Sequence, residues 1–164
     1  MIEIKPAQIG DLGTIQRLAH EIWPNAYLEI LGQQQLDYML EKIYSLPSLQ
    51  HQFTVLKHHF ILLADETVPA GFASFSSHED AAIFHLNKIY VLPSLQGKQL
   101  GKQLLNYIIS EIKKSGATSL QLNVNRYNKA LHFYEKQGFK IIREEDIDIG
   151  SGYFMNDYVL ELKF

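Results

Sequence analysis

Cysteine is absent from the chain, which excludes both disulfide bonds and thiol chemistry. Long apolar runs are also missing, because no stretch reaches the ~18 apolar residues typical of a membrane-spanning helix. No segment resembling a signal peptide opens the chain. Positive charge is scarce: 15 lysines and arginines face 18 aspartates and glutamates, for a formal net charge of −3. Nucleic-acid binders are usually basic, so we expect a cytoplasmic protein without a nucleic-acid or membrane partner.

Patterns typical of metal sites are missing as well. The chain has seven histidines, but no H-x-x-x-H or Cys/His arrangement, and no metal is predicted. It also lacks linker-like segments. A chain of 164 residues can bury roughly two thirds of the surface that it exposes when unfolded, without disulfides or metals to stabilise it. We therefore predict one domain over residues 1–164.

Hydrophobic periodicity predicts alternating helices and strands. Helical spacing covers residues 11–23 (ended by Pro24), 33–44, 98–115 and 128–137, with a further short turn over 49–56. Strands are predicted over residues 2–4, 60–65, 70–76, 82–91, 120–124, 139–149 and 153–162. The helix over 98–115 joins two strands by what should be a right-handed parallel crossover. We expect an α/β (α+β) fold: a mixed, mostly antiparallel sheet of about seven strands, a parallel splayed pair in its middle and about four flanking helices.

The segment from Tyr90 to Leu105 contains the strongest binding signal. A strand ends there, a proline-led loop follows, and the sequence Gln-Gly-Lys-Gln-Leu-Gly opens an apolar helix. Glycine lets the backbone approach a ligand closely, and the first N–H groups of a helix are unpaired and lie at the positive end of its dipole. Lys98 and Lys102 add positive charge. The segment indicates a phosphate-binding site, although an ordinary loop-to-helix junction can have the same composition.

Two common nucleotide-binding motifs do not fit this loop. A P-loop needs a glycine, four further residues and then Gly-Lys-Ser/Thr. Here Gly101-Lys102 is followed by Gln103, and Gln96 stands at the position of the first glycine. The loop has no G-x-G, because Gly97 and Gly101 are four residues apart, and this excludes the dinucleotide fingerprint.

Three segments can be read together: Leu86-x-x-Ile-Tyr-Val-x-Pro93, Gln96-Gly-x-x-x-Gly101 and Asn128-x-x-Ala-x-x-Phe-Tyr-Glu-Lys-x-Gly-Phe139. In combination they resemble the GNAT superfamily of acyl-CoA-dependent N-acetyltransferases, and the resemblance spans essentially the whole chain. It implies the GNAT fold and acetyl transfer to an amine. Gln99 departs from the superfamily motif Gln/Arg-x-x-Gly-x-Gly/Ala, which has a glycine there. We expect Gln99 to take the negative φ of a first helical turn and to leave the phosphate site intact.

The resemblance implies acetyl-CoA as the cofactor. Backbone amides of the loop would hold its pyrophosphate, and they belong to Gln96, Gly97, Lys98, Gln99, Leu100, Gly101 and Lys102. Ile89, Tyr90 and Val91 lie on the strand that would bond the pantetheine arm through its backbone. Asn128 would bond the pantetheine amides, cap the following helix, or do both.

The implied chemistry is direct attack of a neutral amine on the thioester within a ternary complex. Tyr134 stands where the superfamily keeps a tyrosine that protonates the leaving thiolate; its alternative role is packing. Many relatives have a strand glutamate as the base, but the corresponding segment here reads His-Leu-Asn-Lys. His85 is then the nearest titratable candidate, and Asn87 can orient a substrate or a water. Glu21 and Asp157 are other possible proton acceptors, while an isolated strand histidine can equally be structural.

The acceptor site is expected opposite the cofactor, on the first two helices and the last hairpin. An aromatic group there, with Glu21, Glu29 or Asp157 nearby, would attract an ammonium by cation–π interaction and by charge. The group comprises Trp23, Tyr27, Tyr38 and Tyr153. Trp23 ends an apolar stripe and is equally suited to the core.

The aromatic first loop and the run from Ile149 to Glu161 resemble the branch that contains bacterial polyamine acetyltransferases. This implies a small-molecule amine, such as a polyamine, as the acceptor. Two alternatives stay open: a protein or peptide N-acetyltransferase, and a non-catalytic acyl-CoA-binding module. Aromatic strand edges near the carboxyl terminus would also suit a homodimer.

Overall fold

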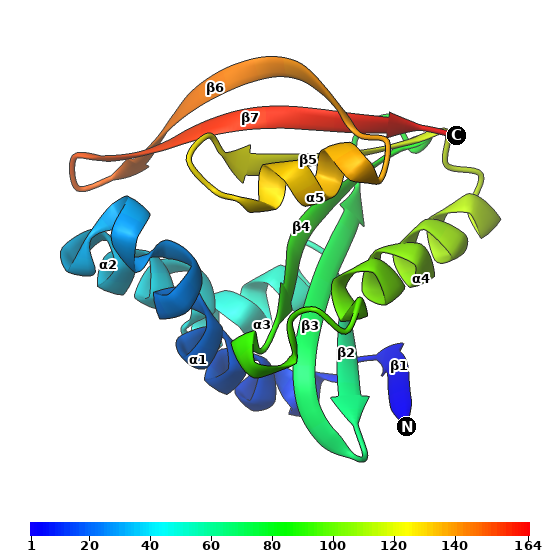
Figure 1. Ribbon diagram of the computed structural model, residues 1–164, viewed down its shortest axis with the longest axis horizontal. Helices are drawn as coiled ribbons and strands as arrows, with labels where there is room; N and C mark the ends of the chain where they lie inside the picture. Colours follow the sequence, from blue (N-terminus) through cyan, green and yellow to red (C-terminus); the bar gives the residue numbers. More distant parts are fainter.

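Seven strands form one sheet, with helices on both of its faces. A computed structural model describes all 164 residues (Figure 1). The strands are β1 (Ile2–Pro6), β2 (His59–Asp65), β3 (Val68–Ser77), β4 (Ile83–Val91), β5 (Ser119–Asn125), β6 (Lys140–Gly150) and β7 (Tyr153–Lys163). The α-helices are α1 (Leu12–Leu31), α2 (Gln33–Tyr44), α3 (Leu46–Thr54), α4 (Leu100–Lys114) and α5 (Ala130–Lys136).

The sheet is antiparallel except at its centre. Its strand order is β1-β2-β3-β4-β5-β7-β6, and β4 and β5 are the parallel pair. They pair only from Ile83 with Ser119 to Leu86 with Leu122, and beyond that point they separate. Helix α4 makes the crossover between them. The predicted mixed sheet with a central parallel pair is confirmed.

Strand β4 is irregular beside this separation. Leu86 and Lys88 pair with consecutive residues of β3, so Asn87 is an extra residue in β4. Such a bulge changes the direction of the side chains that follow it. After the bulge, Ile89 packs against the core beneath α4, whereas Tyr90 packs against the core formed by α1.

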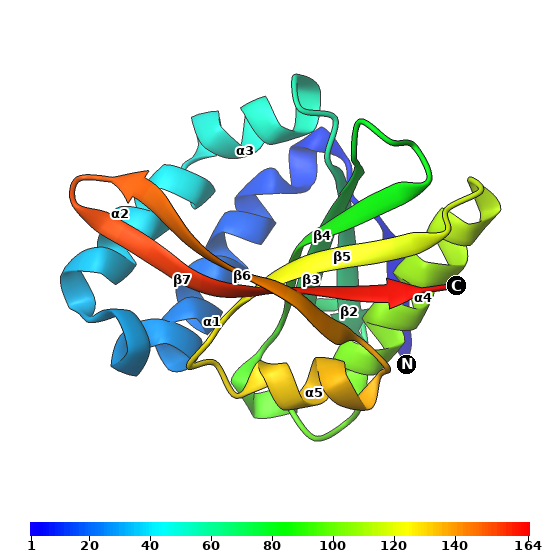
Figure 2. The same ribbon diagram turned by 90° about the horizontal axis from the view of Figure 1, so that it is seen from above.

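Two apolar cores lie on opposite faces of the sheet. Helices α4 and α5 cover one face, and α1, α2 and α3 cover the other (Figures 1 and 2). The inward stripe of α4 is fully buried in the first core and consists of Leu100, Leu104, Leu105, Ile108 and Ile112. The second core is rich in aromatic rings, among them Trp23, Tyr27 and Tyr44. No helix is long and apolar enough to cross a membrane.

Two helix predictions differ from the structure in their bounds. Helix α1 does not end at Pro24 but continues to Leu31, because Trp23 and Tyr27 on either side of the proline are both buried in the core. The short turn expected over 49–56 is the nine-residue helix α3, which Ser45 caps through its side-chain oxygen. With α3 counted, five α-helices flank the sheet, in line with the prediction of about four.

Candidate functional site

A cleft of about 860 Å³ opens where β4 and β5 separate. Its walls come from the second half of α1, the end of β4, the loop before α4, and from β5 and α5. Every residue predicted to bind the cofactor lines this cleft except Lys98, and so do Tyr27, Asn87 and Tyr134. Segments that are far apart in the sequence therefore meet at the point where the sheet divides.

The loop before α4 presents a row of unpaired backbone donors. The N–H groups from Gly97 to Lys102 donate to no backbone or side-chain acceptor within the chain, and the first paired amide of the helix is that of Gln103. Gly97, Gln99, Gly101 and Lys102 line the cleft. Unpaired N–H groups at a helix N-terminus, together with the helix dipole, make an anion-binding site. A diphosphate fits this set of donors, because it offers several charged acceptor oxygens.

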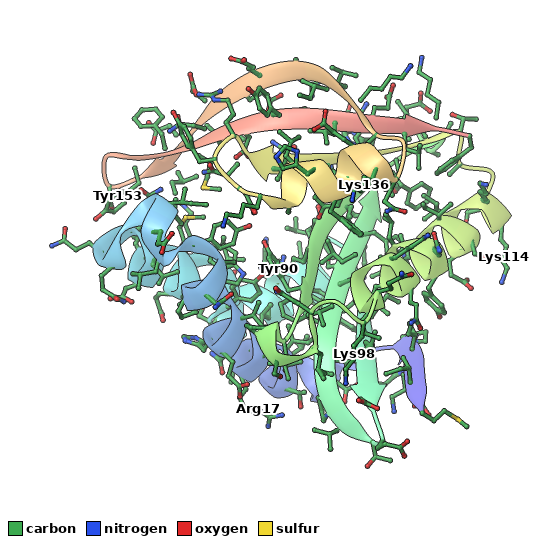
Figure 3. All side chains as sticks on the ribbon, in the orientation of Figure 1. Arg17, Tyr90, Lys98, Lys114, Lys136 and Tyr153 are labelled. Carbon is green, nitrogen blue, oxygen red and sulfur yellow. The ribbon has the colours of Figure 1, made fainter.

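The prediction that Gln99 has a negative φ was wrong. Gln99 has φ +60° and ψ +26°, in the left-handed region, and α4 begins only at Leu100 rather than at Lys98. Left-handed backbone is strained for a residue with a Cβ, whereas glycine adopts it freely. This explains why glycine suits the position, and the chain keeps the left-handed turn without it. Lys98 lies on the outer side of the loop (Figure 3) and does not line the cleft.

Asn128 links α5 to the aromatic wall of the cleft. Its Oδ1 accepts a hydrogen bond from the Ala130 amide at 2.9 Å, so it caps the helix as one of the two expected roles. Its Nδ2 lies 3.5 Å from the Tyr27 hydroxyl, which is in turn 2.9 Å from the Tyr90 hydroxyl. Burial raises the pKa values of Tyr27 and Tyr90 above the usual phenol value. Both hydroxyls therefore stay protonated at neutral pH.

Tyr134 lines the cleft from α5 and is otherwise surrounded by the core. Its ring packs edge-to-face against Phe133 and Phe139, with centroid distances of 5.3 and 5.7 Å. The hydroxyl makes no hydrogen bond within the chain. Burial raises the pKa of Tyr134 well above its usual value, which keeps the hydroxyl protonated at neutral pH and makes it a weaker acid in the free chain.

The structure does not bring His85 into the cleft. Its ring lies 5.6 Å from that of His78, and burial together with the His78 charge lowers the pKa of His85 to about 4. An imidazole with this pKa is a weak base for an ammonium group with a pKa near ~10. The predicted catalytic role of His85 thus has no support in its position. Asn87 does line the cleft and donates to the Ser76 hydroxyl at 3.0 Å.

Three of the predicted substrate residues have structural roles outside the cleft. Trp23 is 4% exposed and packs between Tyr27 and Tyr44, so the core role considered for it is the one observed. Tyr38 donates to the Ile149 carbonyl at 2.6 Å and packs on Tyr153, which ties α2 to the β6–β7 hairpin. Figure 3 shows Tyr153 at the end of that hairpin and Tyr90 near the centre of the molecule.

Sequence reasoning missed a buried lysine in the cleft wall. Lys88 is 7% exposed and lines the cleft; its Nζ donates to Gln52 Oε1 at 2.6 Å and lies 5.6 Å from the ring centres of both Tyr44 and Phe60. Burial lowers the pKa of Lys88 to about 8. A lysine between apolar positions of a strand was the available signal, but the bulge at Asn87 had to be known before its face could be assigned.

Comparison with known proteins identifies the family to which the chain belongs. A family model described as the acetyltransferase (GNAT) domain matches residues 27–155. The chain belongs to the GNAT acetyltransferase family. This GNAT domain is 30% identical to the spermidine N(1)-acetyltransferase of Thermoplasma acidophilum, over 99% of this chain and 98% of that protein.

Two further relatives bear on the site. The crystal structure of the PaiA N-acetyltransferase from Thermoplasma acidophilum, in complex with coenzyme A, is 28% identical, has a TM-score of 0.84 and matches over 100% of this chain and 99% of its own. The [ribosomal protein bS18]-alanine N-acetyltransferase of Haemophilus influenzae is 36% identical over 46% of this chain and 47% of its own length. The predicted GNAT fold, N-acetyltransferase class and acetyl-CoA cofactor are confirmed.

Proposed function

We propose that this GNAT domain acetylates a primary amine of a polyamine or of a similar small amine. The observation that carries the proposal is the match to a spermidine N(1)-acetyltransferase over nearly the full length of both chains. The cleft supports it, because unpaired N–H groups lie at one end while tyrosine and asparagine side chains and the carboxylate of Glu29 line other parts of its wall. Carboxylates and aromatic faces attract ammonium groups.

Acetyl-CoA fits the residues of the cleft. The unpaired amides of Gly97 to Lys102 would hold its pyrophosphate, with the Lys102 ammonium beside them. Beyond Leu86, β4 has no partner strand on its β5 side, so its backbone from Ile89 to Val91 is free to bond the pantetheine amides. When bound, acetyl-CoA supplies an acetyl group activated as a thioester.

The side chains of the cleft would then handle orientation and protons. The Tyr134 hydroxyl is protonated at neutral pH and has no partner within the chain, so it is free to donate its proton to the leaving sulfur. Asn128 is fixed by its capping bond, which leaves its Nδ2 to orient a polar group in the cleft. The extra residue Asn87 places an amide in the wall beside the parallel pair.

The proposal is tested by release of free thiol from acetyl-CoA in the presence of single acceptors. The panel comprises spermidine, spermine, amino acids, aminoglycosides and short peptides with different N-terminal residues. We expect the highest kcat/KM with a polyamine, and mass spectrometry should find one added acetyl group. A preference for alanine-terminated peptides would instead favour protein acetylation, for which the similarity to the bS18-alanine enzyme is the supporting observation.

The third possibility, a non-catalytic acyl-CoA-binding module, predicts a different result. Calorimetry would then detect binding of coenzyme A, while no amine in the panel would release thiol above the hydrolysis rate. The cytoplasmic location and the homodimer stay predictions. Cell fractionation and light scattering, respectively, measure them.

A further inference from the structure

Asp157 is a buried carboxylate with an unpaired oxygen. It lies in β7, opposite Asn125 of β5 and Glu145 of β6, and is 4% exposed. Asn123 Nδ2 donates to its Oδ2 at 3.3 Å, whereas Oδ1 is covered and has no hydrogen-bond partner. An ionised carboxylate can accept about four hydrogen bonds, and a buried charged oxygen without a donor destabilises the fold. A group that is absent from the free chain would satisfy this oxygen.

No cation of the chain pairs with the Asp157 side chain. The Arg126 guanidinium binds Asp146 at 2.7 Å, and its contact with Asp157 is a hydrogen bond to the backbone carbonyl at 3.3 Å. Glu145, the neighbour of Asp157 on β6, is paired with Arg143 at 2.7 Å. The nearby carboxylates of β6 thus form ion pairs with arginines. The Asp157 side chain, in contrast, accepts a hydrogen bond only from the neutral amide of Asn123.

The carboxylate lies directly behind the wall of the acetyl-transfer cleft and does not itself line it. Asn123, which holds its Oδ2, lines the cleft wall on β5 just after the point where β4 and β5 separate. Tyr27 lines the opposite wall, and the Asp157 charge is close enough to help raise the pKa of its hydroxyl. Burial also raises the pKa of Asp157 above the usual carboxyl value. Asn123 Oδ1 makes no hydrogen bond within the chain and can accept one from a ligand.

We propose that Asp157 is the specificity-determining residue that binds the ammonium group of the acceptor amine, with Asn123 as its partner on the cleft wall. The inference rests on the proposed function and assigns its acceptor site. A primary ammonium has three N–H donors and a positive charge. It would therefore give Oδ1 a hydrogen-bond donor and give the carboxylate a counter-charge. Acceptor binding requires a small rotation of Asn123, which is only half-buried and held by bonds of 3.3 and 3.5 Å to Asp157 and Glu145.

The test is Asp157→Asn, which keeps the shape of the side chain and removes its charge. The KM for spermidine should rise by about 10- to 100-fold, the range expected for a lost hydrogen bond to a charged group. The KM for acetyl-CoA should stay within about 2-fold, because the phosphate loop is on another element, and Tm should not fall, because an unpaired buried charge has been removed. The matched control is Glu161→Gln, which removes a carboxylate from the same face of β7 that already accepts a bond from Gln121 at 2.8 Å. Its spermidine KM should equal that of the wild type.

An unchanged spermidine KM in folded Asp157→Asn would overturn the inference and assign Oδ1 to a structural water. If Asp157→Asn does not fold, the smaller Asp157→Ser is measured in the same way and decides by the same criterion. Failure of the proposed function looks different: wild-type protein would then not acetylate spermidine at all. In that case the same variants are measured with the best amine of the acceptor panel, and a cationic acceptor should again lose affinity in Asp157→Asn.

Discussion

Replacing Gln99 by glycine should stabilise the protein, although it removes a side chain. Gln99 has φ +60°, is exposed and makes no capping hydrogen bond, so truncation loses little packing. Left-handed backbone costs a non-glycine residue about 1–2 kcal/mol. Glycine avoids that cost but loses about 0.4–1 kcal/mol through the greater freedom of the unfolded chain. The difference favours Gln99→Gly by roughly 0.5–1 kcal/mol.

Differential scanning calorimetry measures this change. For a chain of this size, 1 kcal/mol corresponds to about 2–4 °C in Tm, so Gln99→Gly should melt about 1–4 °C higher than the wild type. Gln99→Ala is the matched control, because it also removes the side chain but keeps the Cβ and the strain. It should show no gain.

The reasoning also predicts how the cofactor responds to Gln99→Gly. The backbone conformation is already left-handed, so the unpaired amides keep their direction and acetyl-CoA affinity should be unchanged or slightly higher. Two results would refute the argument: a lower Tm for Gln99→Gly than for the wild type, or an equal gain in Gln99→Ala. Either would mean that the left-handed turn is not strained.

Three further predictions follow from the cleft. Tyr134→Phe should lower kcat by about 100-fold, as for loss of a general acid, with the acetyl-CoA Kd from calorimetry nearly kept; an unchanged kcat would remove Tyr134 from the proton transfer. Gly101→Glu should abolish acetyl-CoA binding, because it places a carboxylate among the N–H groups that bind the phosphates. Gly101→Ala should bind normally, because its added Cβ would lie at an ordinary contact distance of 3.8 Å from Phe133. Tight binding by the glutamate variant would show that the phosphates bind elsewhere. The third prediction concerns the free energy of unfolding measured in urea titrations of the wild type and of Lys88→Met. Between pH 8 and 10.5 the unfolded state still binds the Lys88 proton, whereas the folded state, with a pKa of about 8, has released it. The wild type should therefore gain up to about 3 kcal/mol relative to Lys88→Met as the pH rises through this window. Parallel pH curves for the two proteins would show that Lys88 is not desolvated.

The sequence predicted the strand order of the centre and the phosphate loop because local signals specify both. Apolar periodicity marks α4, and the glycines with the flanking lysines mark its N-terminus. The parallel pair followed from the strand-helix-strand unit that joins Val91 to Leu120. These features depend on residues that are neighbours in the chain, so a single sequence contains the information.

The errors lie where tertiary packing overrides local preference. Proline usually ends a helix, but Trp23 and Tyr27 bury enough surface on either side of Pro24 to hold α1 in one piece. The left-handed turn at Gln99 could not be predicted, because a glutamine in the sequence does not indicate a positive φ. Trp23 belongs to the core rather than to the substrate pocket, because the direction of an aromatic side chain depends on which helix packs beside it.

The bulge in β4 explains the remaining difference at the site. One extra residue at Asn87 shifts the alternation of the side chains after it, so the Lys88 ammonium lies beside Gln52, Tyr44 and Phe60. Periodicity counted along the chain cannot detect such a shift, because both registers have similar apolar content. The unpaired oxygen of Asp157 was likewise beyond the sequence, since it depends on how β5, β6 and β7 meet in one register.

The most direct test of the account is steady-state thiol release by the wild-type protein with acetyl-CoA and spermidine, followed by mass spectrometry of the product. We predict saturable, spermidine-dependent release and a mono-acetylated polyamine, with kcat/KM higher than for any amino acid or peptide of the panel. Binding of coenzyme A without thiol release from any polyamine would contradict the account.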